Sequence, residues 1–303
     1  MTSQPLPTEA EVRALLRDRS NWGRWGPDDQ LGAVNLITAA KRVQAAGLVR
    51  SGRAVSLSRP LPTTPAANNP NPAQHFLRFN DGPDGGGAID YYGTSYHGLS
   101  TTHLDALCHM WGEHGMWNGR KPAEVTPAGT NWGGVQAWSD GIVTRGVLLD
   151  IPKLRGEPYV TLEKPVHGWD LEAAAKAQSV ALQPGDALIV NCGREAYERE
   201  AGPWGADPWS RPGLHASCLP FIRDADVAVL VWDMLDFRPT GYTLNWGVHP
   251  VLFSFGVCLI DNARLDDLAR ACQAEGRYDF MLTLAPLVVT GGTGSPLNPI
   301  ALF

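Results

Sequence analysis

Three continuous apolar segments constrain the fold of this chain more than any other feature. They are GVLLDI (146–151), DALIVNC (186–192) and DVAVLVWD (226–233). Unbroken apolar runs of this length are typical of strands buried on both faces, whereas half-exposed strands alternate apolar and polar residues. LEAAAKAQ (171–178) and LDDLARACQAEG (265–276) have the pattern of helices. Because strands and helices alternate, the sequence predicts an α/β fold, with residues 1–303 forming a single domain.

The N-terminal segment 1–50 is predicted to be helical. Thr8 and Glu11 match an S/T-x-x-E capping box ahead of an apolar-periodic stretch that runs through Leu16. A second helix is expected from Ala39 to about Val49.

The following segments predict strands and an irregular connection. AVSLSRPL (54–61) reads as a strand that ends at its proline. Residues 61–90 are rich in Pro, Asn, Gly and Asp and show neither a helical nor a strand period, so a long loop is expected, either a substrate lid or a surface insertion. The tail from residue 285 predicts a strand, a tight glycine turn and an extended end.

Composition excludes several classes of partner. A net charge of −6 and a pI near 5.7 offer no general attraction for nucleic acid or for an anionic membrane surface. No apolar run approaches the ~20 residues that cross a bilayer. The N-terminus lacks a basic start followed by an apolar stretch, and the five cysteines form no CxxC pair, so a cytoplasmic protein without a disulfide framework or thiolate zinc site is expected.

The segment THLDALCH (102–109) concentrates metal-ligating side chains. Imidazole nitrogens and a carboxylate together suit Zn²⁺, Mn²⁺ or Fe²⁺. His103 and Asp105 are two residues apart, so in an extended segment they point to the same face. His109 can join them if the chain turns after Ala106. The alternative is a buried polar network without metal, which an isolated HxD pattern by itself favours.

The surroundings of this segment resemble the cyclase family, which includes bacterial kynurenine formamidase and isatin hydrolase. The family signature is H-x-G-T-H-x-D-x-P-x-H, and Thr102, His103, Asp105 and His109 match it, while Leu107 replaces the proline. Further segments also resemble the family: WGPDDQLGAVNLIT (25–38), RGVLLDI (145–151), PGDALIV (184–190) and GGTGSPLNPIA (291–301). The resemblance implies the family's swivelling β/β/α domain and a homo-oligomer.

The resemblance also implies a set of site residues. In the family a late histidine is followed twelve residues on by a glutamate, and His249 and Asp261 have this spacing here, with aspartate in place of glutamate. The expected ligands of a divalent ion, Mn or Zn, are His103, Asp105, His249 and Asp261. His109 is the expected general acid/base, because imidazole titrates near neutral pH.

One position departs from the family pattern. The first signature histidine falls on Leu99, which cannot bind a metal, and the signature glycine becomes Thr101. Three explanations are open. The metal centre functions with His103, Asp105, His249 and Asp261 alone, or His97 replaces the missing signature histidine from two residues out of register, or one metal position has been lost. Simple loss is the preferred interpretation. His97 is then expected to bind substrate together with Trp25 and Trp111, which flank the family-like segments and suit a planar apolar molecule.

The activity implied by the resemblance is metal-dependent hydrolysis of a C–N bond in an amide, formamide, cyclic imide or lactam. The expected partner is a small-molecule substrate. A biosynthetic cyclase or dehydratase that uses His109 for proton transfer, with a reduced or absent metal site, is the alternative that Leu99 keeps open. A non-catalytic small-molecule binding protein is a third.

Overall fold

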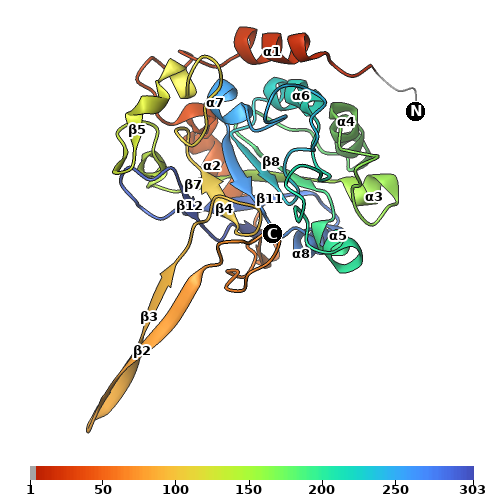
Figure 1. Cartoon of the computed structure of the whole chain (residues 1–303). Helices are drawn as coiled ribbons and strands as arrows, with labels where there is room; N and C mark the ends of the chain where they lie inside the picture. Colours follow the sequence, from red (N-terminus) through yellow and green to blue (C-terminus); the bar gives the residue numbers. More distant parts are fainter. Residues whose placement is uncertain (1–4) are drawn as a thin grey trace.

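The computed structural model describes residues 5–303, so the first four residues of the expected helical segment 1–50 lie outside the described residues. A nine-stranded mixed sheet lies at the centre, with helices around it (Figure 1). Across the sheet the strands follow the order β1 (Ala54–Ser56), β13 (Ile300–Leu302), β11 (Asp279–Leu284), β7 (Ile142–Asp150), β8 (Ala187–Asn191), β9 (Val229–Trp232), β10 (Cys258–Asp261), β4 (His103–Asp105) and β12 (Gly294–Pro296). The predicted α/β class is confirmed.

The middle of the sheet is parallel and both sides of it are antiparallel. β7, β8, β9 and β10 run parallel, and the first three of them contain the apolar runs that predict buried strands. β8 and β9 are buried throughout. β4 and β12 extend the sheet antiparallel on one side, and β11, β13 and β1 extend it on the other. The strand predicted over 146–151 begins earlier and stops at Asp150, because the Asp150 side chain accepts a hydrogen bond from the Lys153 amide and caps the next helix.

The helices are α1 (Glu9–Asp18), α2 (Ala39–Ala46), α3 (Ile151–Arg155), α4 (Gly168–Ala177), α5 (Arg194–Ala201), α6 (Leu219–Asp224), α7 (Val251–Phe255) and α8 (Asp266–Glu275). Short 3₁₀ turns span η1 (Gly32–Leu36), η2 (Trp117–Gly119), η3 (Pro122–Glu124), η4 (Val135–Trp138) and η5 (Ala216–Cys218). The capping box of α1 is confirmed, since the Thr8 hydroxyl accepts from the Glu11 amide and the Glu11 carboxylate accepts from the Thr8 amide. α2, α4 and α8 pack against β7. None of the helices within residues 5–303 is both long enough and apolar enough to cross a membrane.

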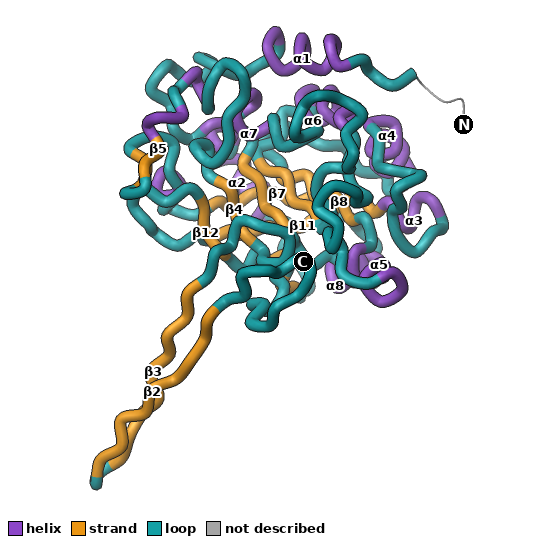
Figure 2. Tube along the Cα trace, viewed as in Figure 1, coloured by secondary structure: helices purple, strands orange, loops and turns teal. Residues whose placement is uncertain are grey.

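The prediction of an irregular loop over residues 61–90 is wrong for the second half of this segment, from Gln74 onward. β2 (Gln74–Gly82) and β3 (Gly85–Gly93) form a two-stranded hairpin that extends away from the rest of the protein (Figures 1 and 2). A two-residue turn, Pro83–Asp84, closes it between the paired Gly82 and Gly85. No residue of β2 or β3 is buried. Neither strand therefore needs the alternation of apolar and polar residues by which a half-buried strand is predicted. A second, smaller hairpin pairs β5 (Val125–Thr126) with β6 (Gly129–Thr130).

The tail also differs from its prediction. The strand expected at residues 285–289 is absent there, and β11 ends just before them, where Pro286 has no amide hydrogen to donate to a sheet. The glycine turn then leads into β12, as the sequence indicates. Gly294 is required in β12, because a Cβ at this position would lie 2.2 Å from the Leu104 carbonyl oxygen of β4. This close approach brings the C-terminal segment onto the strand that carries His103 and Asp105.

Candidate metal centre

β4 positions the first two candidate ligands. All three of its residues are buried between β10 and β12, and His103 and Asp105 point to one face because they are two residues apart. Their Nε2 and Oδ1 atoms are 3.3 Å apart. The His103 Nδ1 lies 2.8 Å from the Thr101 carbonyl oxygen, to which it donates, so Nε2 is the nitrogen left for a metal.

β10 brings Asp261 to the same point. Asp261 is the last residue of β10 and is paired directly with His103 in the antiparallel register. The His103 Nε2 and Asp261 Oδ2 atoms are 3.9 Å apart. The other carboxylate oxygen of Asp261 accepts a hydrogen bond from the Trp232 indole. His103, Asp105 and Asp261 thus each offer a buried ligand atom, all within 4.8 Å of one another.

His249 completes this side of the centre from the turn before α7. Its Nε2 lies 3.3 Å from the Asp261 Oδ2 atom. Its Nδ1 donates to the buried carboxylate of Asp236, whose other oxygen accepts from the backbone amides of Val248 and His249. A carboxylate on the far nitrogen is the arrangement that orients a metal-binding histidine. Sequence analysis missed Asp236 and Trp232, because neither has a fixed spacing to the residue it supports.

His109 and His97 approach Asp105 from the other side. The chain turns at Ala106, whose carbonyl accepts from the His109 amide, and this turn places the His109 Nε2 3.9 Å from the Asp105 Oδ1 atom. The His97 ring stacks on the His109 ring with centroids 3.7 Å apart, and its Nδ1 lies 2.9 Å from the same Asp105 oxygen. The Thr293 hydroxyl, from the segment before β12, holds the His97 Nε2 at 3.0 Å.

Unpartnered polar atoms test whether this arrangement suits a cation. Within residues 5–303, both carboxylate oxygens of Asp105 and the Nδ1 of His97 are buried without a hydrogen bond of good geometry, although the His97 Nδ1 and the Asp105 Oδ1 lie only 2.9 Å apart. Buried polar atoms without partners are rare in folded proteins and destabilise them, whereas a divalent cation would satisfy all three. Asp105 belongs to both groups of candidate ligands, one with His97 and His109 and one with His103 and Asp261. The donor set fits a divalent metal that accepts nitrogen and oxygen ligands.

The pKa values in the centre reflect dense opposing charge. Burial lowers the pKa of His249, but the Asp236 and Asp261 carboxylates outweigh burial and raise it well above 6.5. His103 is shifted upward in the same way by Asp105 and Asp261. Burial raises the pKa of Asp105, but the neighbouring histidines, His109 first, hold it well below 3.8. Burial lowers the pKa of His109 to about 4, so this imidazole is neutral at pH 7 and can accept a proton.

The segment carrying Leu99 is fixed by its backbone. The Leu99 carbonyl accepts from the buried Arg194 side chain at 2.6 Å, and its side chain packs against Gly205. The Asn262 amide donates to the carbonyls of Gly98 and Thr101. His97, and not Leu99, therefore lies beside Asp105, which favours the substitution that the sequence analysis ranked below simple loss.

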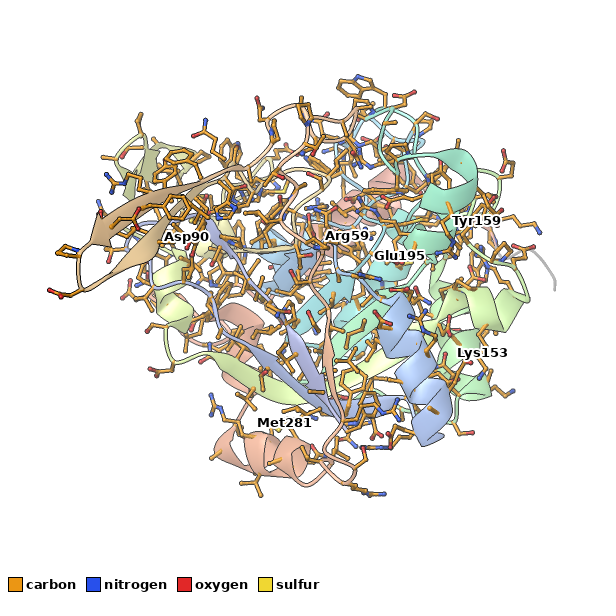
Figure 3. The ribbon with its side chains drawn as sticks, turned by 90° about the horizontal axis from the view of Figure 1, so that it is seen from below. Arg59, Asp90, Lys153, Tyr159, Glu195 and Met281 are labelled. Atoms are coloured by element: carbon orange, nitrogen blue, oxygen red, sulfur yellow. The ribbon has the colours of Figure 1, made fainter. Side chains whose placement is uncertain are left out.

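A partly buried ion pair and its hydrogen bonds support the segment that precedes His103. Arg59, which follows β1, forms a 2.6 Å ion pair with Glu195 of α5, and Figure 3 shows the two side chains beside each other. Arg59 also donates to the Asn262 carbonyl, and its amide donates to the Thr102 hydroxyl. These contacts tie the strand β1, the helix α5 and the end of β10 to the residues just before His103.

The centre opens into a cavity of about 850 Å³. His97, His103, His109, His249 and Asp261 contribute to its wall. Trp111 lines it, as expected. Trp25 does not, because its ring packs on the buried Trp117 with centroids 6.1 Å apart. Several lining residues that sequence analysis missed come from a distant part of the chain and include two aromatic and two basic side chains: Trp209, Trp246, Arg211 and Arg238.

Known proteins share this fold. A crystal structure described as a novel cyclase superposes with a TM-score of 0.85 at 29% identity, covering 95% of this chain and 99% of that chain. Isatin hydrolase A from Labrenzia aggregata bound to benzyl benzoate gives a TM-score of 0.57 at 18% identity, covering 87% of this chain and 98% of that chain. An isatin hydrolase bound to the product analogue thioisatinate gives a TM-score of 0.57 at 16% identity, covering 88% and 99%. No curated protein sequence matches this chain.

The sequence profile of the family described as "Putative cyclase" matches residues 55–238, which is more than half of the chain and includes β4 with His103 and Asp105. The swivelling-domain fold expected from the signature residues is confirmed by the structural similarity. The chain belongs to the cyclase family.

Proposed function

We propose that this protein is a metal-dependent hydrolase that cleaves the C–N bond of an amide, formamide, cyclic imide or lactam. One observation carries the proposal: among the described residues the buried Asp105 carboxylate makes no hydrogen bond of good geometry, and it lies among four candidate ligands that line a cavity of about 850 Å³, namely His97, His103, His109 and Asp261. The isatin hydrolases that share the fold are hydrolases by name, which supports the reaction class.

His103, Asp105, His249 and Asp261 would hold the ion, with His97 as a further ligand beside Asp105. A divalent cation, Mn²⁺ or Zn²⁺, would supply Lewis acidity at this site and would lower the pKa of a water bound to it toward ~7. Asp236 keeps the Nδ1 proton of His249 in place, so that its Nε2 faces Asp261 and the cavity.

His109 is the proposed proton carrier. It is only partly buried, it lines the cavity, and its lowered pKa leaves the ring unprotonated at neutral pH, with a free nitrogen lone pair. In the proposed role it takes up a proton and then donates this proton to the leaving nitrogen, as general acid–base catalysis requires. Stacking on His97 holds the plane of the ring.

Elemental analysis combined with activity tests the proposal. Purified protein is assayed against a panel of N-formyl aromatic amines and cyclic imides, before and after treatment with a chelator, and again after Mn²⁺ or Zn²⁺ is restored. We expect stoichiometric metal and hydrolysis that the chelator abolishes and metal restores. Conversion of a substrate by metal-free protein would favour the cyclase or dehydratase alternative, and binding without turnover would favour a binding protein.

We also propose that the chain forms a homo-oligomer through the β2–β3 hairpin. Phe76, Phe79, Tyr91 and Tyr92 are exposed on it, and Phe76 stacks on Tyr91 at 4.6 Å. A two-stranded hairpin is marginally stable alone in water, so a second copy packing on these aromatic side chains would stabilise it. Light scattering on wild type and on Phe79→Ser tests this. A wild-type protein that is monomeric at micromolar concentration contradicts it.

A further inference from the structure

Arg211 is a buried cation in the wall of the cavity that contains the metal centre. Only 3% of the surface of Arg211 is exposed to solvent. The Nη1 atom donates to the Pro208 carbonyl at 2.8 Å, but Nε and Nη2 are buried and have no hydrogen-bond partner in the described part of the chain, residues 5–303. Burial lowers the pKa of Arg211 to about 10, which still leaves the guanidinium charged at neutral pH. Donors left unpaired in this way destabilise a fold unless a ligand or water uses them.

Arg238 lies directly beside it. The backbone amides of Arg211 and Arg238 donate to each other's carbonyls, at 3.1 and 3.0 Å, as in a directly opposed antiparallel pair, so their side chains share one face. The Arg238 guanidinium lies 4.4 Å from the Trp246 ring centroid and 5.6 Å from that of Trp209. Its Nη2 donates to the Asn245 carbonyl, whereas its Nε is also unpartnered.

The nearby carboxylates do not satisfy these donors. Asp236 and Asp261 raise the pKa of Arg211 through space, but neither accepts a hydrogen bond from its Nε or Nη2. Arg13, the third arginine of the cavity, differs because it pairs with Glu9 at 2.7 Å and with Glu113 at 3.5 Å. Arg211 and Arg238 are therefore the cations of this wall whose Nε donors are unused.

We propose that Arg211, assisted by Arg238, is a specificity-determining residue that binds a carboxylate of the substrate, separate from the C–N bond that is cleaved. This inference rests on the proposed function. The unused Nε and Nη2 form one edge of the guanidinium, which is the edge that binds a carboxylate through two parallel hydrogen bonds. Trp111, Trp209 and Trp246 line the same cavity and suit a planar group. The substrate class is thus an aromatic or otherwise planar amide that bears a carboxylate.

Binding measurements separate this inference from the proposed reaction. Benzoate, benzamide and phenyl phosphate are titrated into the full chain as purified, and again in the presence of EDTA, with tryptophan fluorescence and calorimetry as readouts. We expect benzoate to bind at least about 10-fold more tightly than benzamide, with or without EDTA. Equal affinities, no benzoate binding, tighter binding of phenyl phosphate, or benzoate binding that EDTA abolishes would each overturn the carboxylate assignment.

Variants identify the residue responsible. Arg211→Gln should weaken benzoate binding by about 10- to 100-fold and leave benzamide binding unchanged. Arg211→Lys should restore part of the benzoate affinity, because lysine keeps the positive charge but lacks the two parallel N–H donors of the guanidinium. Arg24→Gln is the matched control, because Arg24 is paired with Asp226 and lies outside the cavity, and its benzoate affinity should equal wild type. If Arg211→Gln does not fold, Arg238→Gln, at a less buried position, should still lower the preference for benzoate over benzamide. An unchanged preference would overturn the proposal, whether or not the protein proves to be a hydrolase.

Discussion

His103 and Asp261 face each other across antiparallel strands β4 and β10, with the Nε2 and Oδ2 atoms 3.9 Å apart. They are far apart in the sequence, yet the sheet register places them on one face. A carboxylate and an imidazole at this separation, with Asp105 beside them, leave room for an ion between them. The register of two short strands therefore defines one side of the candidate centre.

His103→Ala and Asp261→Ala should each lower the metal content of the purified protein to below half of the wild-type value. In the proposed role these residues contribute more to the ion than to the apolar core, so we expect the circular dichroism spectrum to be retained. Elemental analysis measures the metal, with Ser100→Ala in the same segment as a control. Wild-type metal content in both variants would contradict the ligand assignment.

His109→Ala separates proton transfer from metal binding. We expect most of the metal to remain, while kcat falls by about 10²–10⁴-fold, the usual contribution of a positioned general acid/base. His114→Ala, five residues later and exposed, should behave as wild type in both assays. If His109→Ala loses metal as completely as His103→Ala, then His109 is a ligand and not the proton carrier.

His97 and Leu99 can be compared directly. Because His97 lies beside Asp105 while Leu99 packs on Gly205, His97→Ala should weaken metal binding and Leu99→His should add no metal. Chelator competition gives both affinities. A gain of metal in Leu99→His would show instead that this position faces the centre and that a ligand had been lost from it.

Asp236→Asn tests the orientation of His249. The amide side chain has nearly the same shape but cannot stabilise the Nδ1–H of the ring as a carboxylate does, so metal affinity should fall by about 10- to 100-fold. The readout is metal affinity, since a merely structural role would lower the melting temperature and leave the affinity of the folded protein unchanged.

Metal binding should depend on pH with a definite sign. The neighbouring carboxylates raise the pKa values of His103 and His249, so each ring keeps its second proton to a higher pH than a free imidazole, and this proton must leave before an ion binds. Affinity should rise with pH through the neutral range, by at most about tenfold per pH unit for each protonated ring. Calorimetry in buffers of different ionisation enthalpy would detect the released protons. A pH-independent affinity between pH 6 and 8 would contradict this.

The hairpin β2–β3 shows where local sequence patterns fail. Its side chains are all exposed in the chain, so no burial pattern selects its strands, and only the turn residues around Pro83–Asp84 hint at it. Trp25 fails for another reason. Its sequence neighbours resemble the family, but its ring packs on Trp117 instead of reaching the cavity.

The sequence by itself determined the buried parallel strands, the cap of the first helix and the shared face of His103 and Asp105. Apolar runs, capping residues and the two-residue period of a strand are local properties. Only the tertiary structure decided that His97 takes the place next to Asp105, that Asp236 orients His249, and that Arg211 and Arg238 share the cavity wall. These contacts join segments whose separation in the chain is set by loops and by strand order. A loop has no period that a sequence pattern can reveal, so side chains that meet through loops are found only when the chain has folded.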